Sequence, residues 1–75
     1  MNIEWVEGFE INVKVDECGA VVISANREGL LSLAQQFTAL AETLPGDHIH
    51  YDQDNSLEEG STELIVDKTG PIRFR

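Results

Sequence analysis

The chain has 75 residues and a formal net charge of −9, from fourteen acidic and five basic side chains. A chain this short predicts one domain over residues 1–75, whose small core leaves little room for an enclosed active site. The charge argues against binding to nucleic acids or anionic membranes, because both are negative, and favours a basic protein partner.

The first predicted elements are two strands joined by a turn. Apolar residues alternate with polar ones from Phe9 to Val15, and Ile3 and Trp5 continue the same parity, which is typical of a strand with one buried face. A corner at 17–19 leads into the almost continuous apolar run 20–25. Such a run predicts a strand in the middle of a sheet, with a neighbour on each side.

One amphipathic helix follows. Asn26 is a favoured N-cap, Gly29 would allow close approach of helix and sheet, and Pro45 with Gly46 ends the helix by Leu44. The apolar residues recur at three- and four-residue steps, so we expect them to form one stripe that covers the sheet. These residues are Leu30, Leu33, Ala34, Phe37, Leu40, Ala41 and Leu44.

Two further strands are predicted at 48–52 and 62–68, and 69–75 is either a frayed tail or a short edge strand at 72–75. A helix of about 25 Å carries the chain back along the sheet, so the strands before and after it should be parallel. The predicted fold is therefore α+β, in the order β-β-α-β-β. It has one four-stranded mixed or antiparallel sheet with the single helix packed on one face.

The other face of that sheet should be open to water. It would display acids, imidazoles and a few apolar side chains, a mixture that suits docking or self-association as well as an ordinary solvated surface. The residues expected there are Glu10, Asn12, Lys14, Val22, His48, His50, Asp52, Glu63, Ile65 and Asp67.

Two patterns suggest metal binding as an alternative function. His48, His50 and Asp52 alternate along one strand face and could hold zinc if Glu63 or Asp67 joined them. Acids at the first, third and twelfth positions of 52–63 match an EF-hand calcium loop, although its sixth position is Leu57 instead of glycine. No nucleophile lies near a plausible base, so we expect neither an enzyme nor a cofactor.

The sequence also resembles a family of small bacterial proteins. The resemblance covers about 20–68 and rests on three blocks of the kind G-N-x-x-G-L-x-x-L-A, H-x-H-x-D and L-x-x-G-S-x-E-L-x-I/V. Ala25 replaces the first glycine. The matching residues are Asn26, Gly29, Leu30, Leu33 and Ala34; His48, His50 and Asp52; and Leu57, Gly60, Ser61, Glu63 and Leu64. The family is immunity protein family 32 of polymorphic toxin systems, and the resemblance implies a cytoplasmic antidote that binds and blocks a toxin.

The leading hypothesis is therefore a non-enzymatic, acidic binding protein that occludes a basic toxin such as a nuclease. The expected contacts are His48, His50, Asp52, Asp54, Glu58, Glu59 and Glu63. The alternatives are a small zinc- or calcium-binding domain and a homodimeric domain, with a monomer or a weak homodimer expected in solution. The single Cys18 excludes an internal disulfide, and no stretch approaches the ~20 apolar residues of a membrane span, which fits the cytoplasm.

Overall fold

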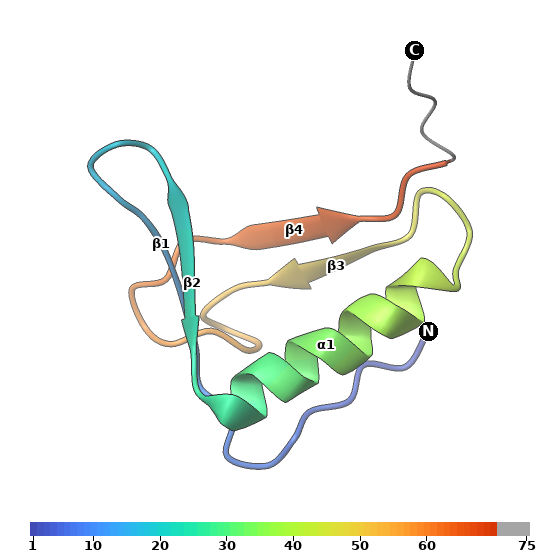
Figure 1. Ribbon diagram of the computed structural model, residues 1–75, viewed down its shortest axis with the longest axis horizontal. Helices are drawn as coiled ribbons and strands as arrows, with labels where there is room; N and C mark the ends of the chain where they lie inside the picture. The colour runs from blue at the N-terminus through green and yellow to red at the C-terminus, as the bar shows by residue number, and fades with distance from the viewer. Residues whose placement is uncertain (71–75) are drawn as a thin grey trace.

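A computed structural model describes residues 1–70 of the chain and contains two β-hairpins joined by one helix (Figure 1). The predicted element order and the α+β class are confirmed. The elements are β1 (Ile11–Val15), β2 (Val21–Ala25), α1 (Arg27–Ala41), β3 (His48–Tyr51) and β4 (Leu64–Asp67). The predicted strand at 72–75 lies outside the described residues.

The predicted four-stranded sheet is wrong. β1 pairs with β2 and β3 pairs with β4, each antiparallel, in two separate sheets that run in different directions (Figure 1). The second edge of β1 is occupied by the loop between β3 and β4. The amide of Glu58 donates to the Ile11 carbonyl at 2.9 Å, and that of Thr62 to the Val13 carbonyl at 2.7 Å. This loop takes the place of a third strand beside β1. β2 and β3 belong to different sheets and do not form the predicted parallel crossover.

β2 is an edge strand, not the central strand that its apolar run predicted. Within the described chain its only partner is β1, in a register that sets Val13 opposite Ile23. Val21 is 59% exposed, and Val22 and Ile23 are also exposed. An uncharged edge strand with apolar side chains on both faces is unusual for a soluble protein, which normally protects such edges.

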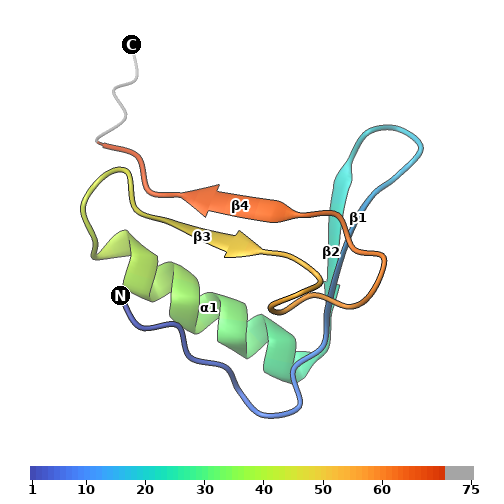
Figure 2. The same cartoon turned by 180° about the vertical axis from the view of Figure 1, so that it is seen from behind.

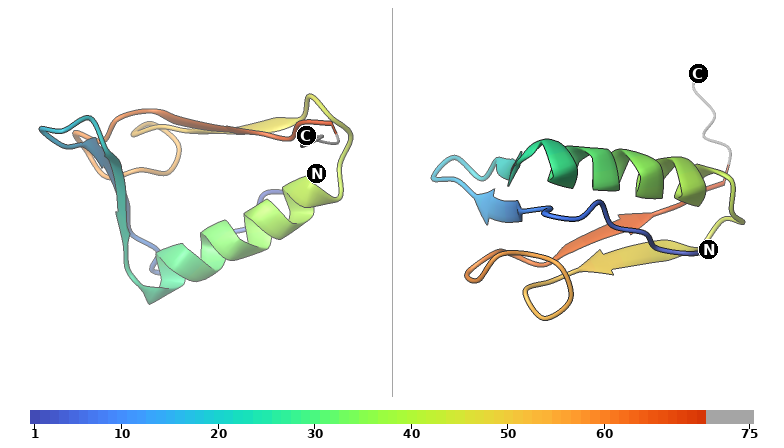
Figure 3. Two further views of the ribbon diagram at one scale, coloured as in Figure 1. Left: turned by 45° about the horizontal axis from the view of Figure 1, so that its top comes forward. Right: turned by 90° about the horizontal axis from the view of Figure 1, so that it is seen from below.

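The core lies between α1 and the inner faces of the two hairpins, which form three sides around it in the left view of Figure 3. The buried apolar residues are Ile11, Val13, Leu33, Leu40, Ile49, Tyr51 and Leu57. The N-terminal segment 1–10 runs beside α1 (Figure 2) and does not extend the first strand as predicted. Trp5 stacks on Phe9 at 4.2 Å between ring centroids and meets Tyr51 edge-on.

α1 buries a different side from the predicted apolar stripe. Of that stripe only Leu33 and Leu40 are buried, and the rest of the buried side of the helix is Gly29, Ser32 and Gln36. The cause is polar. The amide of Val6 donates to Ser32 Oγ at 2.8 Å, and Gln36 Nε2 donates to the carbonyl of Glu4 at 2.7 Å. These bonds turn the polar side of α1 toward the N-terminal segment, and much of the apolar stripe faces solvent.

Tyr51 connects β3 to the helix and should make stability sensitive to alkaline pH. Its hydroxyl donates to Gln36 Oε1 at 2.7 Å, and burial raises the pKa of Tyr51 from 10.0 to about 12. Ionisation therefore favours the unfolded chain: this contribution to stability is complete below about pH 10 and is lost as the pH rises to about 12.

We expect Tyr51→Phe to lower the free energy of unfolding by about 1 kcal/mol near neutral pH, because Gln36 Oε1 loses its donor. The variant should also lose less stability than the wild type between about pH 10 and pH 12. Urea unfolding of both proteins across this range measures the difference. If the free energies of unfolding of the two proteins changed in parallel with pH, ionisation of Tyr51 would not be the cause of the alkaline destabilisation.

Candidate functional site

The outer face of β3 carries two exposed histidines. Ile49 and Tyr51 point into the core, so the alternating His48 and His50 point away from it. Their ring centroids are 4.9 Å apart. The structure thus brings these two predicted site residues together on a surface that the core does not use.

Asp52 does not share this face as predicted, because β3 ends at Tyr51. Its side chain is partly buried, and its Oδ1 accepts the amides of Asp54 at 2.9 Å and Asn55 at 3.0 Å. Its carbonyl accepts the amide of Leu57 at 2.8 Å. Asp52 therefore shapes the start of the loop, and its carboxylate is already engaged within the protein.

The segment 52–63, here called the acidic loop, carries the other predicted contacts. Its exposed carboxylates are those of Asp54, Glu58, Glu59 and Glu63. The loop is anchored at several points: Leu57 is in the core, the Gly60 amide donates to Gln53 Oε1 at 2.9 Å, and Ser61 Oγ accepts the amide of Val13 at 3.2 Å. The carboxylates are thus displayed from a loop that the fold holds in place.

Cations within residues 1–70 do not neutralise these carboxylates. The one ion pair of this part of the chain joins Arg27 to Glu28 at 3.5 Å. Lys14 Nζ donates to the carbonyl of Gly60 at 3.2 Å, and Lys68 Nζ donates to that of Ala41. Both lysines therefore bind backbone oxygens and not carboxylates. Lys14 offsets one charge of the acidic loop, which keeps a net negative charge for a partner.

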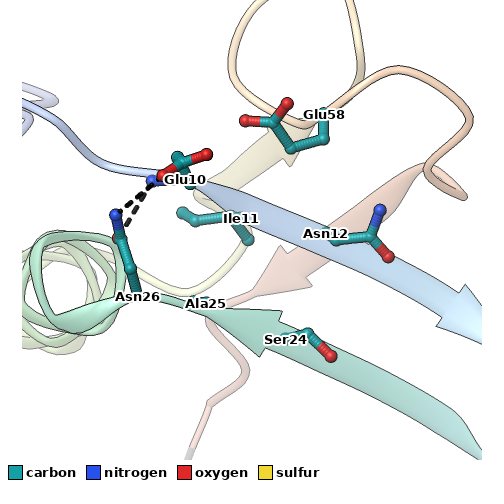
Figure 4. A pocket seen from close by; sticks show the side chains of 7 residues that line it. All are labelled: Glu10, Ile11, Asn12, Ser24, Ala25, Asn26 and Glu58. Atoms are coloured by element: carbon teal, nitrogen blue, oxygen red, sulfur yellow. Dashed lines mark hydrogen bonds between the residues drawn. The ribbon is translucent and has the colours of Figure 1, made fainter.

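A hollow of about 360 Å³ lies beside the acidic loop, on the outer face of the first hairpin (Figure 4). It contains the carboxylates of Glu10 and Glu58, and Asn12 and Ser24 also line it. Glu10 was not among the predicted contacts, although its outward position on the first strand was predicted. The hollow extends the acidic surface from the loop onto β1.

The single open face predicted from the sequence is divided between two sheets. Asn12, Lys14 and Val22 alternate with the core residues of the first hairpin and lie on its outer face. The second hairpin has its own outer face, formed by His48, His50, Ile65 and Asp67. A partner that contacts both faces must therefore bridge the acidic loop between them.

The geometry does not support the metal alternatives. Among residues 1–70, no three His, Cys, Asp or Glu side chains converge into a group that could hold a metal ion. The segment 52–63 is flanked by β3 and β4, whereas an EF-hand loop joins two helices. Its sixth residue, Leu57, is buried, and the carboxylate of its first residue, Asp52, binds backbone amides.

Residues 20–69 match the family model of immunity protein 32. The chain belongs to the immunity protein 32 family. The resemblance noted from the sequence is thus confirmed, over a region that includes β2, α1 and the whole second hairpin with its acidic loop. Searches of curated proteins and of solved structures returned no match.

Membership of the immunity protein 32 family implies a protein that neutralises a toxin by binding it. The expectations of a non-enzymatic protein and of a toxin as its protein partner are confirmed at this level. Within the described residues, no helix is long and apolar enough to cross a membrane.

Proposed function

We propose that this immunity protein neutralises its toxin by covering a basic surface with the acidic loop. The observation that carries the proposal is the exposure of Asp54, Glu58, Glu59 and Glu63 on an anchored loop, where none of them forms an ion pair with a cation of residues 1–70. Unpaired surface carboxylates raise the rate of encounter with a basic partner and oppose encounters with acidic ones.

The two histidines extend this surface. Asn55 Nδ2 donates to the carbonyl of His50 at 3.1 Å, so the acidic loop packs against the end of β3 near His50. An imidazole can donate or accept a hydrogen bond, and it adds apolar ring area to an otherwise charged interface. The proposed contact set is His48, His50, Asp52, Asp54, Glu58, Glu59 and Glu63, with Asp52 acting by holding the loop.

A nuclease is the toxin class that this surface fits best. The active site of a nuclease binds phosphates and is therefore basic, and a chain with a net charge of −9 is complementary to it. Neutralisation then needs no chemistry from the immunity protein: it excludes the nucleic acid by occupying its site. The antidote acts in the cytoplasm, where the nucleic acid of the producing cell would be attacked.

Charge reversal tests the proposed surface. We expect the triple variant Glu58→Lys, Glu59→Lys, Glu63→Lys to bind the toxin about tenfold more weakly, mainly through slower association, and with a flatter dependence on salt. The matched control is Glu4→Lys, Glu7→Lys, Glu17→Lys, which changes the net charge equally at exposed sites outside the loop. The association and dissociation rates of each variant are measured with the toxin captured from the native host and are compared with those of the wild type.

Equal weakening by the two triple variants would show that only the overall charge matters and would remove the acidic loop as the binding site. Unchanged binding by the loop variant would do the same. Circular dichroism of each variant establishes that the fold is intact before the rates are compared.

A further inference from the structure

α1 presents an exposed side without charge. No ionisable residue occurs between Gly29 and Ala41, although a quarter of the chain is charged. Leu30 is 55% exposed, and Leu31 and Phe37 are 38% exposed, with one edge of the Phe37 ring packed against the buried Tyr51. Exposed helix faces in soluble proteins are normally polar or charged, and an apolar one marks a surface that a partner covers.

β2 leads directly into α1 (Figure 1) and is also uncharged. The side chains of Val21 to Ala25 include no charge, and those of Val21 and Ile23 lie on the inner face of the hairpin, beyond the buried Ile11 and Val13. The histidine face is separate from the uncharged side of α1, because β3 turns Ile49 and Tyr51 toward the core and its histidines outward. The left view of Figure 3 shows α1 and the second hairpin on different sides of the molecule.

The spacing of the exposed residues fits an antiparallel pair of helices. Leu30, Ala34, Phe37 and Ala41 follow one another at steps of four, three and four, the pattern of a helix–helix seam. In an antiparallel pair centred between Ala34 and Phe37, each large side chain faces a small one: Leu30 faces Ala41 of the other helix, and Phe37 faces its Ala34. Such alternation lets two helices approach closely.

The charges at the ends of α1 fit the same arrangement. Arg27 begins the helix with a side chain that is 77% exposed and pairs with Glu28 at 3.5 Å, and Glu42 follows the last residue of the helix. No basic residue occupies the last turn, where the helix dipole is negative. In the antiparallel pair, Arg27 of each helix lies beside Glu42 and the carboxyl end of the other.

We propose that the uncharged side of α1 is the interface of a homodimer, in which two copies pack their helices antiparallel. Copies of a chain with a charge of −9 repel one another elsewhere, and this side lets them meet without opposing like charges. A basic toxin would gain no electrostatic attraction here. One helix pair buries less than the ~800 Å² per partner of a standard interface, so it supports a weak dimer, with a dissociation constant in roughly the micromolar range.

Sedimentation velocity from about 1 µM to about 1 mM tests the dimer, because its population depends on concentration. We expect the wild-type mass to rise from monomer to dimer over this range. Ala34→Glu places a charge on an exposed position of the seam and should weaken the dimer at least tenfold. The matched control is Ile65→Glu, at a position that is 50% exposed on the histidine face, and it should leave the dimer unchanged.

A charge exchange tests the antiparallel arrangement. Arg27→Glu alone should weaken the dimer about fivefold, and the double variant Arg27→Glu, Glu42→Arg should restore it. A wild-type mass that stays monomeric over the whole range would overturn the proposal. So would dissociation by Ile65→Glu without dissociation by Ala34→Glu, because the dimer would then use the histidine face. If the wild type were monomeric and Ala34→Glu lost toxin binding, this side of α1 would be the binding site of the toxin instead.

Discussion

Replacing Gly29 with alanine is expected to destabilise the protein by about 2–3 kcal/mol, although alanine normally stabilises a helix by up to about 1 kcal/mol relative to glycine. A Cβ at this position would lie 2.6 Å from the carbonyl oxygen of Glu10, 2.9 Å from Ile11 Cγ1 and 3.1 Å from the Cβ of Ala25. The first of these atoms belongs to the backbone of the segment that enters β1. The helix must therefore move away from both strands of the first hairpin.

The matched control is Gln35→Gly, at an exposed position of the same helix outside the proposed dimer seam. Helix propensity alone should make this variant about 1 kcal/mol less stable, and the same effect alone would make Gly29→Ala more stable than the wild type. Urea unfolding of both variants gives the two free energies. A Gly29→Ala protein as stable as the wild type would show that α1 does not need this close approach.

Asn26→Ala is expected to cost about 2 kcal/mol, more than the ~1 kcal/mol of a typical N-cap. The Asn26 side chain joins three segments. Its Oδ1 accepts the amide of Gly29 at 2.8 Å and that of Glu10 at 3.0 Å, and its Nδ2 donates to the carbonyl of Gly8 at 2.9 Å (Figure 4 shows this side chain beside Glu10). Alanine removes these three bonds and a longer one from Nδ2 to Glu10 Oε1 at 3.4 Å.

Asn26→Asp distinguishes the contribution of the N-cap acceptor from that of the side-chain amide donor. A carboxylate still accepts both amides, but it cannot donate to the Gly8 carbonyl, and it lies close to the carboxylate of Glu10. We expect the free energy of unfolding to fall by about 1 kcal/mol, to a value between those of the wild type and of Asn26→Ala. Thermal and urea unfolding rank the three proteins. If Asn26→Asp were as unstable as Asn26→Ala, the amide donor and not the cap would be the main contribution.

Local signals in the sequence identified most of the secondary structure. The alternation from Phe9 to Val15, the cap at Asn26 and the Pro45-Gly46 break each act within a few residues, so they predicted β1, the start of α1 and its approximate end. Gly29 was also interpreted correctly, because a glycine early in a helix suggests a close neighbour, and the Glu10 carbonyl is that neighbour.

The assembly of these elements was not predictable from the same signals. A loop with no strand pattern, 58–62, takes the second edge of β1, and only tertiary structure shows this. The orientation of α1 was missed because hydrophobic periodicity assumes that apolar residues are buried. Ser32 and Gln36 are buried instead, through hydrogen bonds to the N-terminal segment, and they leave Leu30 and Phe37 exposed.

Only some of the contact surface could be predicted from the sequence. The pairing of His48 with His50 follows from strand alternation, but Asp52 left their face because the strand ends one residue earlier. The hollow that joins Glu10 to Glu58 depends on the path of the acidic loop along β1, which no local pattern indicates.

Capture of the toxin from the native host, with the tagged immunity protein as bait and a series of salt washes, tests the central claim most directly. We expect one basic protein at a one-to-one ratio, released as the salt concentration rises, and captured much less by the variant Glu58→Lys, Glu59→Lys, Glu63→Lys. A partner that the variant retains as well as the wild type does, or no partner at all, would contradict the claim that the acidic loop neutralises a basic toxin.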